Sequence, residues 1–280
     1  MSTAGATPIL AVDGLVKRFR LRRSLLDGLR RVPSKSHVAV DDVSFSLHRG
    51  EILGLAGQSG SGKSTVARCL TRLVTPDSGA INLDGEDVRA VSGASLREIR
   101  RRMQMIYQDP YTSLHPRMTI GAAIIEAGRV HRRPGSENPE KFVSGLLEQV
   151  GLPSGTASRR PRELSGGQRQ RVAVARSLAV GPDVLIADEA VSALDVSVQA
   201  QLLNLFLDLR DQLGLSILFI SHQLAVLAEV CDRVAIMNRG RIVEIGATID
   251  VFTNPRDAYT RELLAAHPDP DPSHRNKEPA

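Results

Sequence analysis

Tryptophan is absent from this sequence, and the other aromatic residues are few, with six phenylalanines and three tyrosines among 280 residues. Proteins that bind single-stranded nucleic acid commonly stack bases on aromatic side chains, so this scarcity argues against that class. The ordinary apolar content predicts an aliphatic interior instead. A chain of this length can bury a large core, either as one large domain or as two small ones.

Cysteine is also scarce, and Cys69 and Cys231 are the only two. Disulfide-rich secreted domains and zinc sites need more cysteines at shorter spacings. We therefore expect both thiols to be plain core residues of a protein in a reducing compartment.

Long apolar runs are missing as well. No window approaches the roughly 18 uninterrupted apolar residues that indicate a membrane-spanning helix. The N-terminus lacks the charged segment and the following apolar run of a signal peptide. We expect a cytosolic chain that reaches a membrane only through partners.

The formal net charge of +5 is distributed unevenly along the chain. Basic residues concentrate between positions 17 and 35, where they could contact acidic lipid headgroups or an acidic partner. A solvated loop would explain the same run, and the sequence leaves both interpretations open. The run comprises Lys17, Arg18, Arg20, Arg22, Arg23, Arg30, Arg31 and Lys35.

Apolar patterning predicts strands that alternate with helices. Continuous apolar runs at 52–56, 184–187 and 215–220 indicate buried strands, and 65–74 and 198–213 have helical character. Buried strands connected through helices form mostly parallel sheets that are covered on both faces. The predicted fold class is therefore α/β.

Further strands and helices are predicted around this core. The sequence pattern predicts antiparallel strands beside the first buried strand, at 9–20, 38–47 and 80–83. It also predicts a hairpin formed by 233–237 and 241–245. A basic helix at 96–102 and a strand at 103–107 lead into a region with helical periodicity, 119–152, that is broken at 133–139. This middle part of the chain resembles a mainly helical subdomain inserted into the core.

The residues GQSGSGKST at 57–65 fit the phosphate-binding pattern G-x-x-x-x-G-K-[ST] without a mismatch. A buried strand precedes them and a helix follows, which is the context that distinguishes this pattern from an ordinary Gly/Ser turn. Glycines let backbone N–H groups surround a polyanion, and the helix N-terminus adds positive potential. We expect Lys63 to reach the β- and γ-phosphates and the Ser64 hydroxyl to bind Mg²⁺. The predicted nucleotide-binding residues of this phosphate loop are Gly57, Gln58, Ser59, Gly60, Ser61, Gly62, Lys63, Ser64 and Thr65.

Two adjacent carboxylates, Asp188 and Glu189, follow the buried strand at 184–187. Burying such a pair is costly unless a cation or solvent satisfies it. Ligands of open α/β sheets bind outside the carboxyl ends of the strands, which places this pair beside the phosphate loop. We expect Asp188 to hold Mg²⁺, directly or through water, and Glu189 to orient and polarise the attacking water. An acidic helix start is the alternative, which the upstream loop makes the weaker interpretation.

A glycine pair within LSGGQ, at 164–168, opens a basic helix and forms a second possible anion site. One chain hardly needs two phosphate cradles for one nucleotide. Taken alone, a Ser-Gly-Gly turn carries little information.

The order of these segments resembles the nucleotide-binding subunits of ABC transporters. It runs from GQSGSGKST (57–65) through Gln108, LSGGQ (164–168), VLIADE (184–189) and SALD (192–195) to His222. The resemblance covers nearly the whole chain and implies a P-loop NTPase (RecA-like) core with an antiparallel β subdomain and an inserted helical subdomain. It also implies that two subunits pair head to tail, with LSGGQ of one facing the γ-phosphate held by the other. That arrangement would account for the second cradle.

The resemblance implies one ABC ATPase domain at 1–270. Its core would cover about 1–95 and 165–250, its helical subdomain about 96–164, and a C-terminal helical extension about 251–267. The Pro-rich, charged tail at 268–280 is predicted to be disordered.

The resemblance further implies roles for single residues. Phe19 is similar to the aromatic that stacks on adenine, with a core phenylalanine as the alternative. Gln108 is similar to the glutamine that reaches Mg²⁺ and the attacking water and couples the nucleotide to the membrane partner. His222 is similar to the histidine that contacts the γ-phosphate. The opposite site would be completed by Ser165, Gly166, Gly167 and Gln168.

At a finer level the chain resembles the peptide and nickel importer branch. The resemblance lies in YQDPYTSLHPRMTIG (107–121), GGQRQRVAVARSLAV (166–180), DVSVQAQLLNL (195–205), RGRIVEIG (239–246) and NPRDAYTRELLAA (254–266). It implies ATP and Mg²⁺ as cofactors. The implied partners are a second, related ATPase chain, two transmembrane permease subunits and, indirectly, an extracytoplasmic solute-binding protein, without nucleic acid. The chain would lie peripherally on the cytoplasmic face of the inner membrane.

Two positions depart from the branch pattern. Ala190 replaces the proline that usually follows the glutamate at position 189, and Gln223 replaces the aspartate that usually follows the histidine at 222. Both changes could alter the hydrolysis rate or the asymmetry between the two sites. Neither removes a residue with a direct chemical role, so we expect ATP hydrolysis.

The expected function is ATP hydrolysis that energises uptake of oligopeptides, dipeptides or a related small solute. The alternatives are a nickel or glutathione-type importer ATPase and a non-transport ABC ATPase of DNA repair or translation. A component that binds nucleotide within a soluble enzyme assembly is a further alternative. The sequence does not identify the solute, because other chains of such systems select it.

Overall fold

The computed structural model describes residues 7–20, 36–109 and 114–266. Most of the basic stretch between 17 and 35, and the tail at 268–280 that we predict to be disordered, lie outside these residues. In the part of the chain that is described, no helix combines the length and the apolar character needed to span a membrane.

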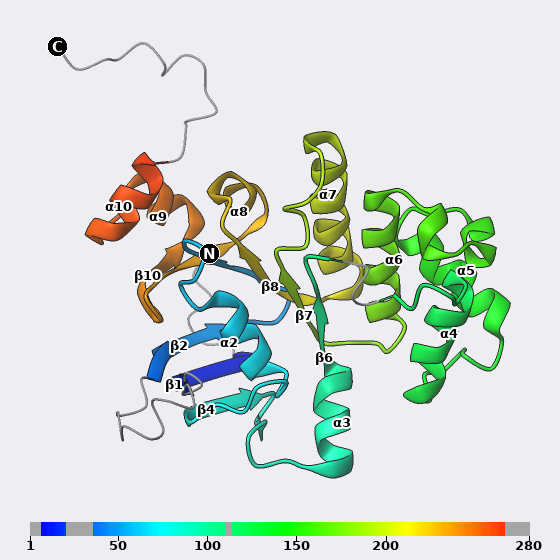
Figure 1. Cartoon of the computed structure of the whole chain (residues 1–280), viewed down its shortest axis with the longest axis horizontal. Helices are drawn as coiled ribbons and strands as arrows, with labels where there is room; N and C mark the ends of the chain where they lie inside the picture. The colour runs from blue at the N-terminus through cyan, green and yellow to red at the C-terminus, as the bar shows by residue number, and fades with distance from the viewer. Residues whose placement is uncertain (1–6, 21–35, 110–113, 267–280) are drawn as a thin grey trace, which may run out of the picture.

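A six-stranded sheet forms the centre of the molecule, in the order β10-β9-β3-β8-β7-β6 (Figure 1). Its strands run parallel except for β10, which pairs antiparallel with β9 at one edge. β3, β7 and β8 are buried over their whole length, as their continuous apolar runs predict. The α/β fold class is therefore confirmed. The strands are β3 (Ile52–Ala56), β6 (Met103–Ile106), β7 (Val184–Asp188), β8 (Ser216–Ser221), β9 (Arg233–Asn238) and β10 (Arg241–Ala247).

A second, antiparallel sheet lies beside the first, in the order β2-β1-β4-β5. Helix α2 (Lys63–Leu70), this sheet and one face of the central sheet share a hydrophobic cluster that includes Leu53 and Leu55 of β3. The antiparallel strands predicted around the phosphate loop are thus present. They are β1 (Leu10–Arg20), β2 (Ser36–Leu47), β4 (Ser78–Leu83) and β5 (Glu86–Asp87).

Helices cover the other face of the central sheet. Because successive strand residues point to opposite faces, Ile52 and Phe219 enter a second cluster on this side. Phe206 of α7 (Val196–Leu213) meets Phe219 edge to face, with 5.4 Å between the ring centroids. Helix α8 (Leu224–Val230) follows β8, and α9 (Thr248–Thr253) and α10 (Ala258–Ala265) lie next to β10.

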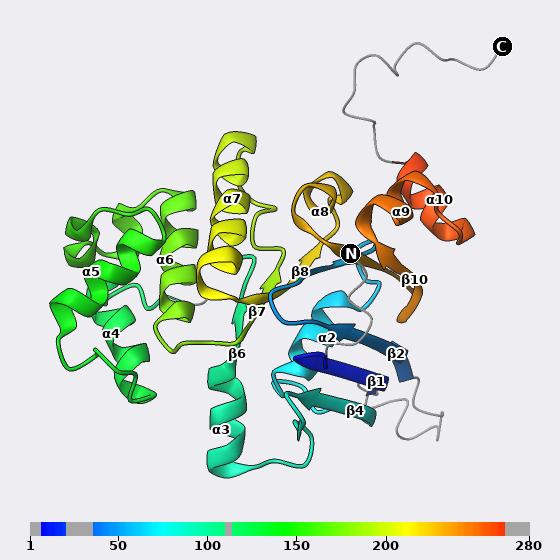
Figure 2. The same ribbon diagram turned by 180° about the vertical axis from the view of Figure 1, so that it is seen from behind.

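A helical lobe extends from the side of the sheet opposite to the antiparallel strands, as both views show (Figures 1 and 2). The helical region predicted at 119–152 is present and is interrupted at the predicted break. The lobe consists of α4 (Ile120–Val130), α5 (Pro139–Gln149), the short 3₁₀ helices η2 (Ser154–Ser158) and η3 (Pro161–Glu163), and α6 (Gly166–Leu178).

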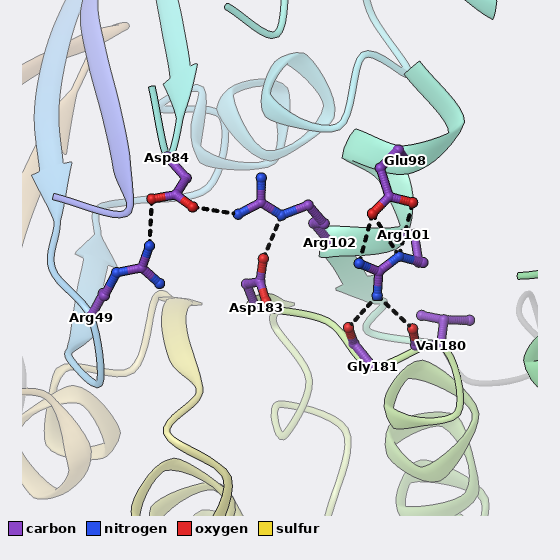
Figure 3. A network of polar contacts seen from close by, with 8 residues as sticks. All are labelled: Arg49, Asp84, Glu98, Arg101, Arg102, Val180, Gly181 and Asp183. Carbon is purple, nitrogen blue, oxygen red and sulfur yellow. Dashed lines mark hydrogen bonds and ion pairs between the residues drawn. The ribbon is translucent and has the colours of Figure 1, made fainter. Parts of the chain in front are cut away.

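The stretch 96–106, which we assigned to the helical subdomain, belongs to the central sheet and its surroundings. β6 pairs in parallel with β7, and α3 (Gly93–Arg102) leads directly into it. At the end of α3, Arg102 donates from Nε to Asp183 Oδ2 (2.5 Å) and from Nη2 to Asp84 Oδ2 (2.9 Å), and Arg49 also pairs with Asp84 (Figure 3). These ion pairs connect α3 to both sheets, so the helical lobe begins after β6.

Arg101 extends the same network toward α6 (Figure 3). Its guanidinium pairs with Glu98 and donates to the carbonyl oxygens of Val180 (3.0 Å) and Gly181 (2.7 Å), just after the end of α6. Carbonyl groups at a helix C-terminus lack partners within the helix, and a cation there is favourable. Arg101 therefore anchors the C-terminal end of α6 to α3.

Helix α2 differs from its predicted bounds of 65–74. It begins at Lys63, directly after Gly62, and ends at Leu70. The chain then turns through Arg72 with a φ of 55°, while the Arg72 guanidinium donates to the carbonyl oxygens of Val88 and Arg89. Cys69 on this helix and Cys231 are both buried, as expected, and burial raises the pKa of the Cys69 thiol to about 11.

Candidate functional site

The phosphate loop, residues 57–65, joins β3 to α2 and depends on its glycines. Gly57 and Gly62 have φ angles of 148° and 112°, which side-chain-bearing residues rarely adopt. A Cβ atom at Gly57 would lie 2.2 Å from the carbonyl oxygen of Met237, and one at Gly62 would lie 2.2 Å from that of Ala39. Only glycine allows the loop to pack this closely against β9 and β2.

Backbone hydrogen bonds hold the loop in shape. Ser61 N donates to Gln58 O (3.1 Å) within the loop, and Gly240 N from the β9–β10 turn donates to Ser61 O (2.9 Å). Asp41 N on β2 in turn donates to Gly240 O (2.8 Å). The loop is therefore tied to both sheets.

Lys63 is buried within the loop, with 5% of its surface exposed. Its Nζ donates to the carbonyl oxygens of Gly57 (2.7 Å) and Gln58 (3.0 Å). Burial lowers the pKa of Lys63, whereas Glu189 and Asp188 act in the opposite direction. The ammonium group is thus held at the loop, where it can donate to phosphate oxygens.

Ser64 and Asp188 meet beside the loop, although they are distant in sequence. Ser64 Oγ donates to Asp188 Oδ1 at 3.0 Å, and Asp188 ends β7 with 7% of its surface exposed. Burial raises the pKa of this carboxyl, and the Ser64 hydrogen bond opposes that shift. A hydroxyl and a carboxylate in contact form a small oxygen-donor set of the kind that binds Mg²⁺ together with phosphate oxygens. The described residues contain no cluster of three or more His, Cys, Asp or Glu that could hold a metal ion.

Glu189 and His222 lie at the ends of the adjacent strands β7 and β8. Glu189 has a φ of 51°, and its N–H donates to Ile220 O at 3.0 Å, which fixes the turn after β7. His222 Nδ1 is 3.2 Å from Glu189 Oε1, and the imidazole side chain is 45% exposed. The carboxylate therefore faces a proton-carrying group at the open edge of the sheet.

The two departures from the branch pattern occupy this same edge. Ala190 is buried, and the side chain of Gln223 accepts a hydrogen bond from Gln199 Nε2 on α7 (3.1 Å). Gln223 thus replaces a charge beside His222 by a neutral contact with α7.

A cavity of about 300 Å³ opens between the phosphate loop and the antiparallel sheet. Phe19, which is 39% exposed, lines it together with Glu189, so the predicted adenine-stacking residue and the predicted water-orienting residue share one cavity. His37 and Ala39, which were not among the predicted site residues, also line it. Only the antiparallel pairing of β1 with β2 places His37 opposite Phe19, so no local sequence pattern marks these two residues as part of the site.

Gln108 lies on the same edge of the sheet but does not line this cavity. It follows β6 by two residues and is exposed. The parallel order β3-β8-β7-β6 brings the carboxyl ends of four strands to one edge, with Gly57, His222, Asp188 and Gln108 following them or ending them.

Residues 165–168 form the start of α6, far from the phosphate loop of the same chain. Ser165 Oγ accepts from Gln168 N (3.3 Å), and Gln168 Oε1 accepts from Ser165 N (3.1 Å), which is a capping box. Both views place α6 and α2 on opposite sides of β6 and β7 (Figures 1 and 2). Ser165 is exposed, so this helix start faces outward.

Known proteins with similar sequences match nearly the whole of this chain. The family model described as ABC transporter matches residues 40–192. The chain is 51% identical over 275 residues to the glutathione import ATP-binding protein GsiA of Pectobacterium atrosepticum, covering 98% of this chain and 44% of that protein. It is 47% identical over 271 residues to a putative peptide import ATP-binding protein of Brucella ovis, covering 97% and 82% of the two chains. The chain thus spans less than half the length of the first relative.

Solved structures share the fold. The cbiO1 protein of Clostridium perfringens, part of an ABC transporter complex, aligns with a TM-score of 0.73 at 26% identity, covering 88% of this chain and 91% of that one. A dimeric ATP-binding cassette in a post-hydrolysis state with ADP and phosphate aligns equally well at 24% identity, covering 85% and 98%. The phosphate loop, the carboxylates at the end of β7 and the outward-facing start of α6 are all present. The chain belongs to the ABC transporter family.

Proposed function

We propose that this chain is the ATP-binding and ATP-hydrolysing subunit of an importer for peptides or for glutathione, which is itself a tripeptide. The similarity to import ATP-binding proteins over nearly the full length of this chain carries the proposal, since it extends beyond the phosphate loop to the C-terminal helices. The geometry supports the ATPase part, because a phosphate cradle, an oxygen-donor pair and a carboxylate–imidazole pair lie at one sheet edge.

Within one chain the residues would divide the work of ATP hydrolysis. The loop N–H groups and Lys63 bind the β- and γ-phosphates and neutralise the charge that develops on them. Phe19 stacks on the adenine from the other end of the cavity. Ser64, Asp188 and Gln108 would hold Mg²⁺, which supplies further charge neutralisation on the phosphates.

Glu189 accepts a hydrogen bond from the attacking water and orients it toward the γ-phosphate. Its backbone is fixed by the hydrogen bond to Ile220 O, and His222 Nδ1 contacts its carboxylate, so the imidazole orients Glu189. The second ring nitrogen, Nε2, would contact the γ-phosphate. A pair of this kind positions the water without a large movement of the chain.

The start of α6, residues 165–168, would act on a second, related ATPase subunit. Its distance from the phosphate loop of the same chain and its outward-facing position support this pairing. A capped helix N-terminus is a favourable site for the γ-phosphate held by the partner. Closing of the dimer on ATP would then complete both sites.

Two transmembrane permease subunits and an extracytoplasmic solute-binding protein are the further partners that we propose, at the cytoplasmic face of the inner membrane. Gln108 and the helical lobe would carry the opening and closing of the dimer to the permeases, since both lie beyond β6 at the edge of the sheet. No nucleic acid takes part in this function.

Reconstitution tests the proposal. The chain, its co-purifying membrane proteins and the solute-binding protein are placed in proteoliposomes, and ATP turnover is measured with a dipeptide, an oligopeptide, glutathione or a nickel chelate. We expect a peptide or glutathione to stimulate turnover and to accumulate inside the vesicles. Co-purification with ribosomes, DNA or soluble enzymes in place of membrane proteins would refute an importer.

A further inference from the structure

The C-terminal helix α10 reaches the phosphate loop although about two hundred residues of sequence separate them. The backbone N–H of Gln58, the second residue of the loop, donates to the hydroxyl oxygen of Tyr259 on α10 at 3.4 Å. This contact crosses 201 positions of the sequence and joins the last described helix to the first functional segment. The resemblance predicts a helical extension at 251–267 but no contact between it and the nucleotide site.

The peptide group between Gly57 and Gln58 is held from both sides. Its N–H, which belongs to Gln58, donates to Tyr259 Oη (3.4 Å), and its carbonyl oxygen, which belongs to Gly57, accepts from Lys63 Nζ (2.7 Å). Lys63 Nζ also donates to the carbonyl oxygen of the next peptide group, Gln58 O (3.0 Å). A rotation of the Gly57–Gln58 peptide would disturb both of its contacts and would therefore change where the Lys63 ammonium rests.

Tyr259 is itself firmly placed. The carboxylate of Asp257 caps α10 by accepting from Tyr259 N (2.8 Å) and Thr260 N (3.4 Å). Glu244 on β10 holds the preceding segment by accepting from Arg256 N (2.8 Å) and Asp257 N (3.1 Å). The tyrosine ring packs against the hydrophobic cluster under α7 and α8, so the hydroxyl is presented from a rigid base.

We propose that Tyr259 is a positioning residue of the nucleotide site, whose hydroxyl fixes the peptide group between Gly57 and Gln58 and thereby presents the phosphate loop and Lys63 to the triphosphate. The C-terminal extension is then a brace of the ATP site that runs from β10 through Glu244, Asp257 and Tyr259 to the loop. This inference rests on the proposed ATP binding and adds a residue to it.

The substitution Tyr259→Phe tests the inference, because it removes the hydroxyl and keeps the ring that packs in the core. A net hydrogen bond of ordinary strength corresponds to an affinity change of about 2- to 10-fold. We expect the Kd of the purified chain for the fluorescent analogue mant-ATP to rise by that factor. In the assembled complex the KM for ATP should rise similarly, with kcat changed by less than about 2-fold, because the Tyr259 hydrogen bond holds the loop equally in the ATP-bound state and in the transition state.

Thr253→Val is the matched control. Thr253 lies on α9 in the same extension, and its hydroxyl donates to Ile249 O (2.7 Å) without contact with the loop. We expect this variant to keep the wild-type Kd and KM. Both variants should keep the wild-type thermal midpoint without nucleotide to within about 3 °C, which corresponds to about 1 kcal/mol in a chain of this size.

A double-mutant cycle separates positioning from general loosening of the extension. Glu244→Ala removes both acceptors that hold the segment before α10. If the brace acts through the Tyr259 hydroxyl, Glu244→Ala weakens mant-ATP binding in the wild-type background and adds little in the Tyr259→Phe background. Equal effects in both backgrounds would assign Glu244 to folding alone and would remove it from the brace.

Two results would overturn the role of Tyr259. One is a wild-type Kd and KM in Tyr259→Phe, and the other is an equal loss in Thr253→Val. If the wild-type chain itself fails to bind mant-ATP, the proposed function falls and this inference falls with it, which distinguishes the two failures.

Discussion

Gly166 offers a test of whether the start of α6 works on a second subunit, because its substitution does not disturb its own chain. A Cβ atom at Gly166 would lie 3.5 Å from Leu194 Cδ2, an ordinary van der Waals contact. At the next residue, a Cβ on Gly167 would lie 2.3 Å from Val198 Cγ1 on α7, and the β-branched valine has little freedom to move. Gly166→Ala is therefore the informative change, and Gly167→Ala confounds folding with function.

The expected effects on stability and on turnover have opposite signs. Alanine in place of glycine at a compatible position stabilises a protein by about 0.4–1 kcal/mol. For a chain of this size the thermal midpoint should rise by about 1–4 °C. If the N–H groups at this helix start contact a partner's γ-phosphate, an added methyl separates them from it, and losing such a contact costs turnover on the order of 10²-fold.

Three measurements check this prediction. Thermal unfolding of the isolated chain reports stability, mant-ATP binding to the isolated chain reports the chain's own phosphate loop, and phosphate release by the assembled complex reports the shared site. Gly145→Ala on α5 is the matched control, since a Cβ there meets nothing within 4 Å. It should gain similar stability and leave turnover unchanged.

Either of two results would refute this prediction. Wild-type turnover of the complex that carries Gly166→Ala would show that this helix start does not approach a phosphate closely. A fall in turnover that is matched by an equal loss of mant-ATP affinity in the isolated chain would place the effect in the chain's own nucleotide site.

Three further predictions concern residues of the phosphate edge. Glu189→Gln should keep mant-ATP binding and reduce phosphate release by about 10²–10⁴-fold. It should also trap a closed dimer, which size-exclusion chromatography in the presence of ATP detects. A wild-type rate of hydrolysis would show that Glu189 does not orient the attacking water. Lys63→Ala should weaken mant-ATP binding by about 10- to 100-fold, the value of a charge-assisted hydrogen bond, and unchanged affinity would contradict the cradle. Burial raises the pKa of Asp188, so the folded chain binds this proton more tightly than the unfolded chain, and the free energy of unfolding falls as pH rises through the carboxyl range. Asp188→Asn should therefore raise the thermal midpoint at pH 8 more than at pH 4, and it should abolish Mg²⁺-dependent turnover. An equal shift of the thermal midpoint at both pH values would show that burial of the Asp188 charge does not destabilise the fold.

The apolar patterning of the sequence predicts most of the central fold. Buried strands such as 184–187 and 215–220 carry continuous apolar runs, and both are strands of the parallel sheet. The pattern is less informative where an edge strand is short and mixed. β6 has only four residues, and its neighbouring basic helix α3 suggested a boundary that ion pairs to Asp84 and Asp183 override.

Helix ends were also set by distant contacts. The apolar residues after Leu70 favour a longer α2, but Arg72 turns the chain and donates to carbonyl groups that follow β5. The contact joins Arg72 to residues outside the helix. The sequence pattern around α2 therefore does not predict where the helix ends.

What the sequence by itself determined about this protein is the chemistry that neighbouring residues perform together. The glycines, Lys63 and Ser64 of the phosphate loop act within one turn of chain, so their spacing alone carries the prediction. Tertiary structure decided which distant groups meet at that loop and beside it. Asp188 contacts Ser64, Tyr259 contacts the backbone N–H of Gln58, and His222 contacts Glu189 next to the loop. Parallel strands bring their carboxyl ends together regardless of their separation in sequence, and a helix packed on β10 can reach a loop that was synthesised long before it. Local patterns record local geometry, whereas these meetings depend on how whole elements pack.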